Sequence, residues 1–316
     1  MTPTDRLPEE LRADLDRARR LEWLNIGFTI SIIVVMGLAL GQSQTMKTAW
    51  IEDTLGLIPP IVFLVAVRFE KRSPSKRFPF GFDRVHSLGF LIAAVALAGV
   101  GVSLLWDAVS GLAHQERATV ASIELFGRSV WLGWVMIAAQ AYSIIPPFII
   151  GQLEMPLAKR LQDEVLFTDA KMNKANWQTG AAGIAGIIGL GLGWWWADAA
   201  AAGLISIGII VDGWRALKVA TIELVDGFPR SLSSSRADPE SKQLMTELER
   251  RFPDSEVRLR ETGRYIRAEV CGAHPPAEDL DLAEIWPGKP ERSWRLAELS
   301  FTPYEPDRRA PPDERE

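Results

Sequence analysis

Long apolar runs dominate the first 230 or so residues of the chain. Four of them contain no Asp, Glu, Lys or Arg, and they cover residues 23–46, 85–106, 129–153 and 175–197. A helix needs about 20 mostly apolar residues to cross a bilayer, so each run is long enough to span it. Two shorter runs, residues 54–67 and 199–211, suffice only if Glu52, Asp53 and Asp212 are drawn into the membrane. The pattern predicts a six-helix transmembrane domain over residues 23–226, preceded by a cytoplasmic segment over residues 1–22.

The distribution of basic residues sets the expected orientation. Residues 1–22, 68–84 and 154–174 together hold 15 Lys and Arg, whereas the alternate connections hold three, namely Lys47, Arg117 and Arg128. Short loops rich in Lys and Arg stay on the cytoplasmic side of a membrane. We therefore predict an integral membrane protein with both termini in the cytoplasm, in a bacterial inner (plasma) membrane.

The chain changes character after Arg236. Asp238 followed by Pro239 is typical of a helix start, and the spacing of Leu244 and Leu248 predicts one apolar helical face. Alternating apolar and polar residues predict strands near residues 257–259, 266–270 and 295–301, with a short helix over 280–286. These elements predict a small cytoplasmic α+β domain over residues 236–305. The Pro-rich, charged residues 306–316 are expected to be a disordered tail.

Composition excludes several classes of function. The 316 residues carry a net charge of −5, which gives no bias toward nucleic acid, and one cysteine, Cys271, excludes a disulfide scaffold. His86, His114 and His274 are too scattered to form a zinc site. His86 could relay a proton or could be a hydrogen-bonded interfacial residue. Nucleotide-binding and hydrolase motifs are missing from the sequence, so an enzyme is not expected.

Two acidic residues begin the second predicted span. Glu52 and Asp53 lie 16 and 15 residues before Arg68. At 1.5 Å per residue this places them roughly 23 Å from the cytoplasmic end, in the outer third of the membrane. Ionisable groups at such depths usually line a cavity or a pathway. Alternatively, the helix starts later and both carboxylates stay at the outer surface as helix-terminal anions.

A polar stripe opens the fifth predicted span. Asp169, Met172, Asn173 and Asn176 follow the i, i+3, i+4, i+7 spacing and therefore share one helical face. Their oxygens and one thioether could coordinate a cation. The same residues also suit a plain polar beginning of a helix at the cytoplasmic side, and spacing alone does not decide between the two.

Two proline pairs interrupt the predicted spans. Pro59–Pro60 removes the helical hydrogen bonds to the carbonyls of Leu55 and Gly56, close to the acidic pair. Pro146–Pro147 does the same to Tyr142 and Ser143 in the fourth predicted span. The freed carbonyls could act as ligands or mark a hinge.

Two short stretches carry a resemblance to a known family, namely residues 78–88 (FPFGFDRVHSL) and Ala197-Asp198-Ala199. Together with the predicted spans and the C-terminal domain, they make nearly the whole chain resemble the cation diffusion facilitator family of divalent-metal exporters. The most specific likeness is the stretch FPFGFDRVHSL, residues 78–88, which is similar to the family's (H/F)PYGxxRxExL motif with Phe80 in place of Tyr and His86 in place of Glu. Ala197-Asp198-Ala199 resembles the start of the family's sixth helix. The resemblance implies a six-helix bundle, a ferredoxin-like cytoplasmic domain and a homodimer.

The resemblance also implies a metal site between the second and fifth helices. The family's four ligand positions correspond to Glu52, Gly56, Met172 and Asn176, of which only Glu52 is a recognisable substitute. The chain therefore resembles a divergent branch whose ligands have moved by one residue. We expect Glu52 and Asp53 to face Asp169, Asn173 and Asn176, with Met172 beside them.

The expected function is export of a divalent cation in exchange for protons. The oxygen-rich ligand set favours Mn²⁺, Fe²⁺ or Mg²⁺ over Zn²⁺ as the transported substrate, and no permanently bound cofactor is expected. Because Gly56 and Asn176 replace metal ligands, the alternative is a relative that does not transport and acts as a membrane scaffold or sensor.

Overall fold

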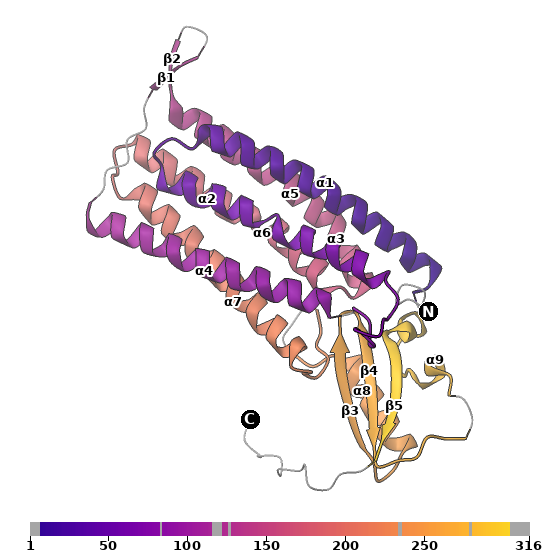
Figure 1. Cartoon of the computed structure of the whole chain (residues 1–316). Helices are drawn as coiled ribbons and strands as arrows, with labels where there is room; N and C mark the ends of the chain where they lie inside the picture. Colours follow the sequence, from indigo (N-terminus) through magenta and orange to yellow (C-terminus); the bar gives the residue numbers. More distant parts are fainter. Residues whose placement is uncertain are drawn as a thin grey trace.

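The computed structural model describes residues 7–82, 84–115, 122–125, 128–232, 236–277 and 280–303. Long helices lie side by side over most of this length, and a small sheet is attached at one end of the bundle (Figure 1). The long helices are α1 (Glu9–Ala39), α4 (Val85–Ala113), α5 (Leu132–Leu161), α6 (Glu164–Gly191) and α7 (Ala197–Leu224). Two shorter helices, α2 (Gln44–Leu55) and α3 (Ile58–Glu70), follow each other along a single path through the bundle.

Five helical segments in the described part of the chain are long and apolar enough to cross a membrane. They are α1, the combined segment Gln44–Glu70, α4, α5 and α7. The sixth expected span falls in α6, whose first three turns carry the polar stripe and several charges. α6 packs against α2, α3, α5 and α7, so it lies inside the bundle, where polar residues can face other helices instead of lipid. A six-span topology remains our prediction.

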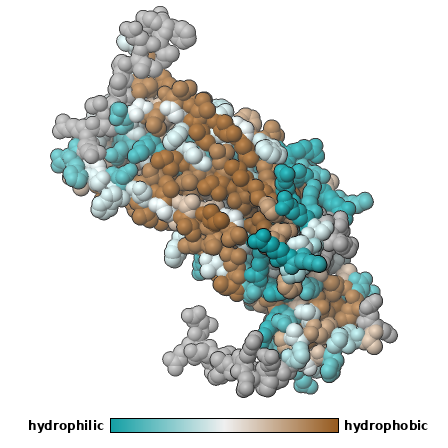
Figure 2. All heavy atoms as spheres, viewed as in Figure 1, coloured by the Kyte–Doolittle hydropathy of each residue, from teal (hydrophilic) through white to brown (hydrophobic). Residues whose placement is uncertain are grey.

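The surface of the bundle fits a membrane environment. Large apolar side chains such as Leu38, Trp106, Leu204 and Trp214 are exposed on the helices. Figure 2 shows a broad apolar area over the middle of the bundle on the face that it draws, with hydrophilic residues toward both ends of the bundle. An apolar surface of this extent is typical of a protein that contacts lipid.

The prolines of the second span divide it into two helices. α2 ends at Leu55 and α3 begins at Ile58, with Pro59 and Pro60 in its first turn. Proline has no N–H to donate, but it is tolerated in the first turn of a helix, so the chain restarts a helix there. In contrast, Pro146 and Pro147 lie inside α5, which continues through them.

Several boundaries differ from the sequence-based expectation, among them that of the first span, because residues 44–46 begin α2. Residues 129–131 were expected to be helical, but they belong to strand β2 (Arg128–Trp131), which pairs with β1 (Ser122–Leu125) in an antiparallel hairpin at the far end of the bundle. Apolarity alone does not distinguish a short strand from a helix end. Residues 154–174 were expected to be a connection, yet only Gln162 and Asp163 separate α5 from α6.

The C-terminal part forms a three-stranded sheet with helices beside it. It contains α8 (Pro239–Arg251), β3 (Glu256–Thr262), β4 (Tyr265–Cys271), α9 (Leu282–Ile285), a 3-10 helix (Pro290–Arg295) and β5 (Leu296–Thr302). The strand order is β3-β4-β5, with the first pair antiparallel and the second parallel. The predicted strands and helices are confirmed here, whereas a ferredoxin-like arrangement remains a prediction. The predicted tail, residues 306–316, lies outside the described residues.

Candidate functional site

The start of α2 is fixed by a buried carboxylate from α7. Asp198 accepts hydrogen bonds from the Ser43 hydroxyl at 2.5 Å, from the Gln44 backbone N–H at 2.6 Å and from the Thr45 N–H at 3.2 Å. These N–H groups belong to the first turn of α2, where backbone donors have no helical partner. Asp198 therefore anchors the helix that carries the acidic pair.

Glu52 and Asp53 lie in the last turn of α2 and are both half-buried. Glu52 is close enough to Asp53, to Asp212 of α7 and to the Thr179 hydroxyl of α6 to interact with them electrostatically. The Oδ2 atom of Asp53 is buried and has no hydrogen-bond partner within the described part of the chain. The acidic pair is thus set among α2, α6 and α7.

The polar stripe of α6 separates into residues with different neighbours. Met172 packs, together with Ile51 and Leu55, against an apolar cluster that includes Leu97 and Ile205. Met172 and two residues of α2 thus border the same apolar cluster. The polar members Asp169, Asn173 and Asn176 hydrogen-bond within α6 and to α1 and α5.

Asn176 satisfies a carbonyl that a proline leaves free. Its Nδ2 donates to the backbone oxygen of Ser143 at 3.2 Å, and its Oδ1 accepts from the Thr179 hydroxyl at 3.2 Å. The Ser143 carbonyl is the one that loses its helical donor because of Pro147. Asn176 thus joins α6 to the interrupted part of α5, and Thr179 links it to the neighbourhood of Glu52.

Asp169 and Asn173 belong to a buried polar cluster between α1, α5 and α6. The Oδ2 atom of Asp169 accepts hydrogen bonds from Asn25 and from Asn173, both at 3.0 Å. Glu22, Glu154 and Asp169 are buried, and each places a carboxylate oxygen within 4.8 Å of the other two. At that distance, with an effective dielectric constant of about 20, two ionised carboxylates repel each other by about 3.5 kcal/mol.

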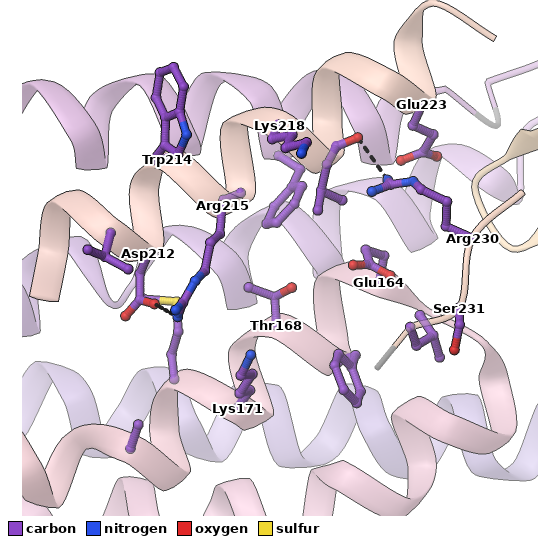
Figure 3. A pocket seen from close by; sticks show the side chains of 18 of the residues that line it. Glu164, Thr168, Lys171, Asp212, Trp214, Arg215, Lys218, Glu223, Arg230 and Ser231 are labelled. Carbon is purple, nitrogen blue, oxygen red and sulfur yellow. Dashed lines mark hydrogen bonds and ion pairs between the residues drawn. The ribbon is translucent and has the colours of Figure 1, made fainter. Parts of the chain in front are cut away.

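A large polar cavity opens between α6, α7 and the C-terminal sheet. Its volume is about 910 Å³. Glu164, Thr168 and Lys171 line it from α6, and Asp212, Arg215 and Lys218 line it from α7 (Figure 3). Glu223, Arg230 and Glu261 line it near the sheet. Met172 and Asp212 also border this cavity, so it reaches the residues that neighbour the acidic pair of α2.

Glu261 of β3 gives this cavity a titratable group close to neutral pH. Burial raises the pKa of Glu261 to about 7, although Arg295 beside it acts in the opposite direction. Its Oε1 accepts from the Arg295 guanidinium at 3.2 Å, and its Oε2 accepts from the Arg230 backbone N–H at 3.3 Å. The charge on this wall of the cavity therefore changes in the physiological pH range.

A buried ionic network joins the sheet to the helical bundle. Arg264, in the turn between β3 and β4, contacts Asp163 at 3.0 Å and Glu70 at 3.4 Å. Glu70 also bonds to the ring of His86 at 3.1 Å. His86 is thus a buried partner of a carboxylate, and Asp163 additionally caps α6 by accepting from the Leu166 N–H at 2.9 Å.

Several residues of these sites were not predicted from the sequence. Glu22 and Glu154 lie immediately outside two uncharged apolar runs and Asn25 lies inside the first of them, so the local pattern does not single them out. Arg264 was not distinguished from other charged residues of the C-terminal part. Their significance comes from burial beside other charged groups, which requires knowing which helices pack together.

Apolar helices that enclose polar and acidic groups define an integral membrane protein with polar sites inside its bundle. Residues 23–225 match the sequence profile of the cation efflux transmembrane domain. The chain therefore belongs to the cation efflux family.

Proteins similar to this chain include zinc and manganese transporters. The zinc transporter ZitB of Escherichia coli (strain K12) is 27% identical over 239 residues, covering 72% of this chain and 67% of that protein. ZitB of Yersinia pseudotuberculosis serotype I (strain IP32953) is 25% identical over 221 residues, covering 67% and 65%. The manganese efflux system protein MneS of Bacillus subtilis (strain 168) is 22% identical over 189 residues, covering 60% and 61%. The chain thus spans less than two thirds of the last two relatives.

Proposed function

We propose that this protein is a secondary transporter that exports a divalent metal cation from the cytoplasm, in exchange for protons. The central observation is the acidic pair Glu52 and Asp53, held inside the helical bundle beside Asp212 and Thr179. Family membership and the zinc and manganese transporters among the relatives support the same conclusion.

The proposed transport site lies between α2 and α6. Glu52 and Asp53 supply carboxylates, Thr179 of α6 lies beside Glu52, and Met172 and Asn176 are the further donors that α6 offers to this site. Asp169 and Asn173 were also predicted as ligands from the sequence, but they hydrogen-bond toward Asn25 of α1 and Glu154 of α5, so they are not part of this set. A set rich in oxygen favours Mn²⁺, Fe²⁺ or Mg²⁺, with Zn²⁺ as the remaining candidate. Protonation of the carboxylates would neutralise the ligands and release the ion, which couples transport to the proton gradient.

The cavity beside α6 and α7 provides a route from the cytoplasmic end. It is bordered by Glu164 and Glu261 near the sheet and by Met172 and Asp212 deeper in the bundle. Acidic and basic side chains are balanced in its lining, so the cavity offers a polar route to Glu52 without a net electrostatic attraction for cations. We further propose that the protein works as a homodimer with both termini in the cytoplasm, in a bacterial inner membrane.

Metal flux into proteoliposomes tests this function. The purified chain is reconstituted with an internal metal-sensitive dye, and uptake of Mn²⁺, Fe²⁺, Mg²⁺ and Zn²⁺ is compared with and without a pH gradient. We expect Glu52→Gln and Asp53→Asn each to reduce flux at least about tenfold, because each removes a charged ligand. Asp107→Asn is the matched control, since Asp107 is exposed and pairs only with Lys47 in the described part of the chain.

The flux measurement also separates the two candidate functions. The result would favour a membrane scaffold or sensor if all variants show equal flux. Binding of the four ions should then also be independent of Glu52. Flux that is independent of the pH gradient would contradict the antiport mechanism while leaving transport intact.

A further inference from the structure

We propose a second cation site, separate from the acidic pair of α2, in which Glu22, Glu154 and Asp169 bind a divalent metal ion together with the amide oxygen of Asn25. Each carboxylate comes from a different helix, namely α1, α5 and α6. A bound ion would therefore connect three helices near the cytoplasmic end of the bundle.

The hydrogen-bond donors of this cluster do not match its acceptors. The side-chain amides of Asn25 and Asn173 both donate to a single atom, Oδ2 of Asp169. Asn173 also reaches Oε2 of Glu154 at 3.5 Å. Both carboxylate oxygens of Glu22, Oε1 of Glu154 and Oδ1 of Asn25 are buried without a partner in good hydrogen-bond geometry in the described part of the chain, although the Asn25 side chain is close enough to interact with Glu22.

Four unpartnered oxygens in one place point to a positively charged ligand. Glu22 is fully buried and Asn25 is 1% exposed, so bulk water does not solvate these atoms. Buried polar atoms almost always have a partner, and one cation satisfies several oxygens at once. Asn25 is neutral, so its unpaired oxygen is an observation independent of the acidic residues.

The charges around Glu22 also favour a bound cation. The ionisable groups that act on it from α5, α6 and the turn between them are Asp169, Glu154 and Asp163, all acidic. Arg160, a basic residue near the end of α5, pairs instead with Asp14 at 2.9 Å. Within the described residues, the cluster thus holds three carboxylates with no basic side chain to balance them, and a divalent ion would compensate most of that charge.

The ligand atoms indicate the class of ion. All of them are carboxylate or amide oxygens, which suit hard cations such as Mg²⁺ and Mn²⁺ and provide no thiolate or imidazole for selective Zn²⁺ binding. Because α2 contributes no residue, the site is distinct from the one proposed for transport. The inference therefore does not depend on the proposed function, and the two can fail separately.

Mn²⁺ binding to the purified full chain tests the proposal. Detergent-solubilised protein is stripped of metal with a chelator and titrated with Mn²⁺, and bound ion is measured by electron paramagnetic resonance, with Mg²⁺ as competitor. We expect Glu22→Gln and Glu154→Gln each to remove one bound Mn²⁺ or to weaken it at least about tenfold. Glu10→Gln, an exposed glutamate of the same helix, is the matched control and should bind as the natural chain does.

Thermal unfolding provides a second readout. Mn²⁺ should raise the unfolding temperature of the natural chain. The increase should be smaller in Glu22→Gln, whereas Glu52→Gln should keep the part of the increase that depends on Glu22. In the metal-free protein Glu22→Gln should be at least as stable as the natural chain, because it removes like-charge repulsion.

Equal Mn²⁺ binding in Glu22→Gln, Glu154→Gln and the natural chain would overturn the proposal. Failure of the natural chain to bind Mn²⁺ at this cluster would overturn it as well, because the carboxylates would then be neutralised by protons alone. Loss of flux in Glu52→Gln with the Glu22-dependent Mn²⁺ retained would support both sites independently.

Discussion

Arg264 donates to Asp163 across 3.0 Å, so an arginine of the C-terminal sheet reaches a carboxylate in the turn between α5 and α6. Both side chains are almost completely buried. The same guanidinium lies 3.4 Å from Glu70 at the end of α3. Buried ion pairs, shielded from water, therefore connect the sheet to the helices that border the acidic sites.

Arg264→Ala should loosen the sheet from the bundle. The substitution leaves Glu70 and Asp163 buried with less positive charge, and breaking a buried ion pair costs about 3–5 kcal/mol. We expect a lower midpoint of thermal unfolding and faster hydrogen exchange in β3 and β4. Arg250→Ala is the control, because Arg250 is exposed and pairs with Glu247 on the surface of α8. Equal stability of the two variants would contradict the role of Arg264.

Asp198→Asn should destabilise the start of α2. The amide replaces one acceptor oxygen with a donor that faces the N–H groups of Gln44 and Thr45, and loss of a helix cap costs about 1–2 kcal/mol. Thermal unfolding in detergent measures the change, with Asp107→Asn as the exposed control. An unchanged unfolding midpoint in Asp198→Asn would show that α2 does not need this cap.

Gly151→Ala should force α5 away from α6. An added methyl group at Gly151 would lie 2.7 Å from the backbone oxygen of Ala170 and 2.9 Å from Cβ of Asn173. Overpacking of this kind costs about 1–3 kcal/mol. Gly27→Ala is the matched control, because a methyl group there meets no atom within 4 Å in the described part of the chain. The prediction fails if the two variants unfold at the same temperature.

Stability should fall as the pH rises between about 4.5 and 7 because of Glu261. Burial raises the pKa of this carboxyl from 4.5 in the unfolded chain to about 7 in the folded protein. The folded state therefore binds the proton of Glu261 more tightly than the unfolded chain does. The stabilisation that results is complete below pH 4.5 and is lost as the pH passes 7.

Glu261→Gln should flatten this part of the stability profile, measured by thermal unfolding at several pH values. Glu247→Gln is the control, since Arg250 and Arg251 lower the pKa of Glu247 to about 2. Its titration lies below the tested window, so the variant should keep the slope of the natural chain. A persistent slope in Glu261→Gln would assign the pH dependence to another group.

The amino-acid sequence determined the elements of this protein. Apolar run length predicted membrane spans, Pro59 and Pro60 indicated the interruption after Leu55, and alternation predicted the strands of the C-terminal sheet. These features depend on residues close together in the chain, so their physical causes can be read locally. Glu52 and Asp53 stood out for the same reason, because two acids beside an apolar run are costly in lipid.

The tertiary structure decided which polar residues meet. Helical spacing placed Asp169 and Asn173 on one face of α6, but only the packing of α1 and α5 against each other and of α5 against α6 brings Glu22, Asn25 and Glu154 to that face. The pairing of Asn176 with the Ser143 carbonyl likewise depends on where α5 lies. Whether a buried charge is unusual depends on the groups that surround it, and these groups come from other helices, in the case of Asn25 and Asp169 from 144 positions away in the sequence.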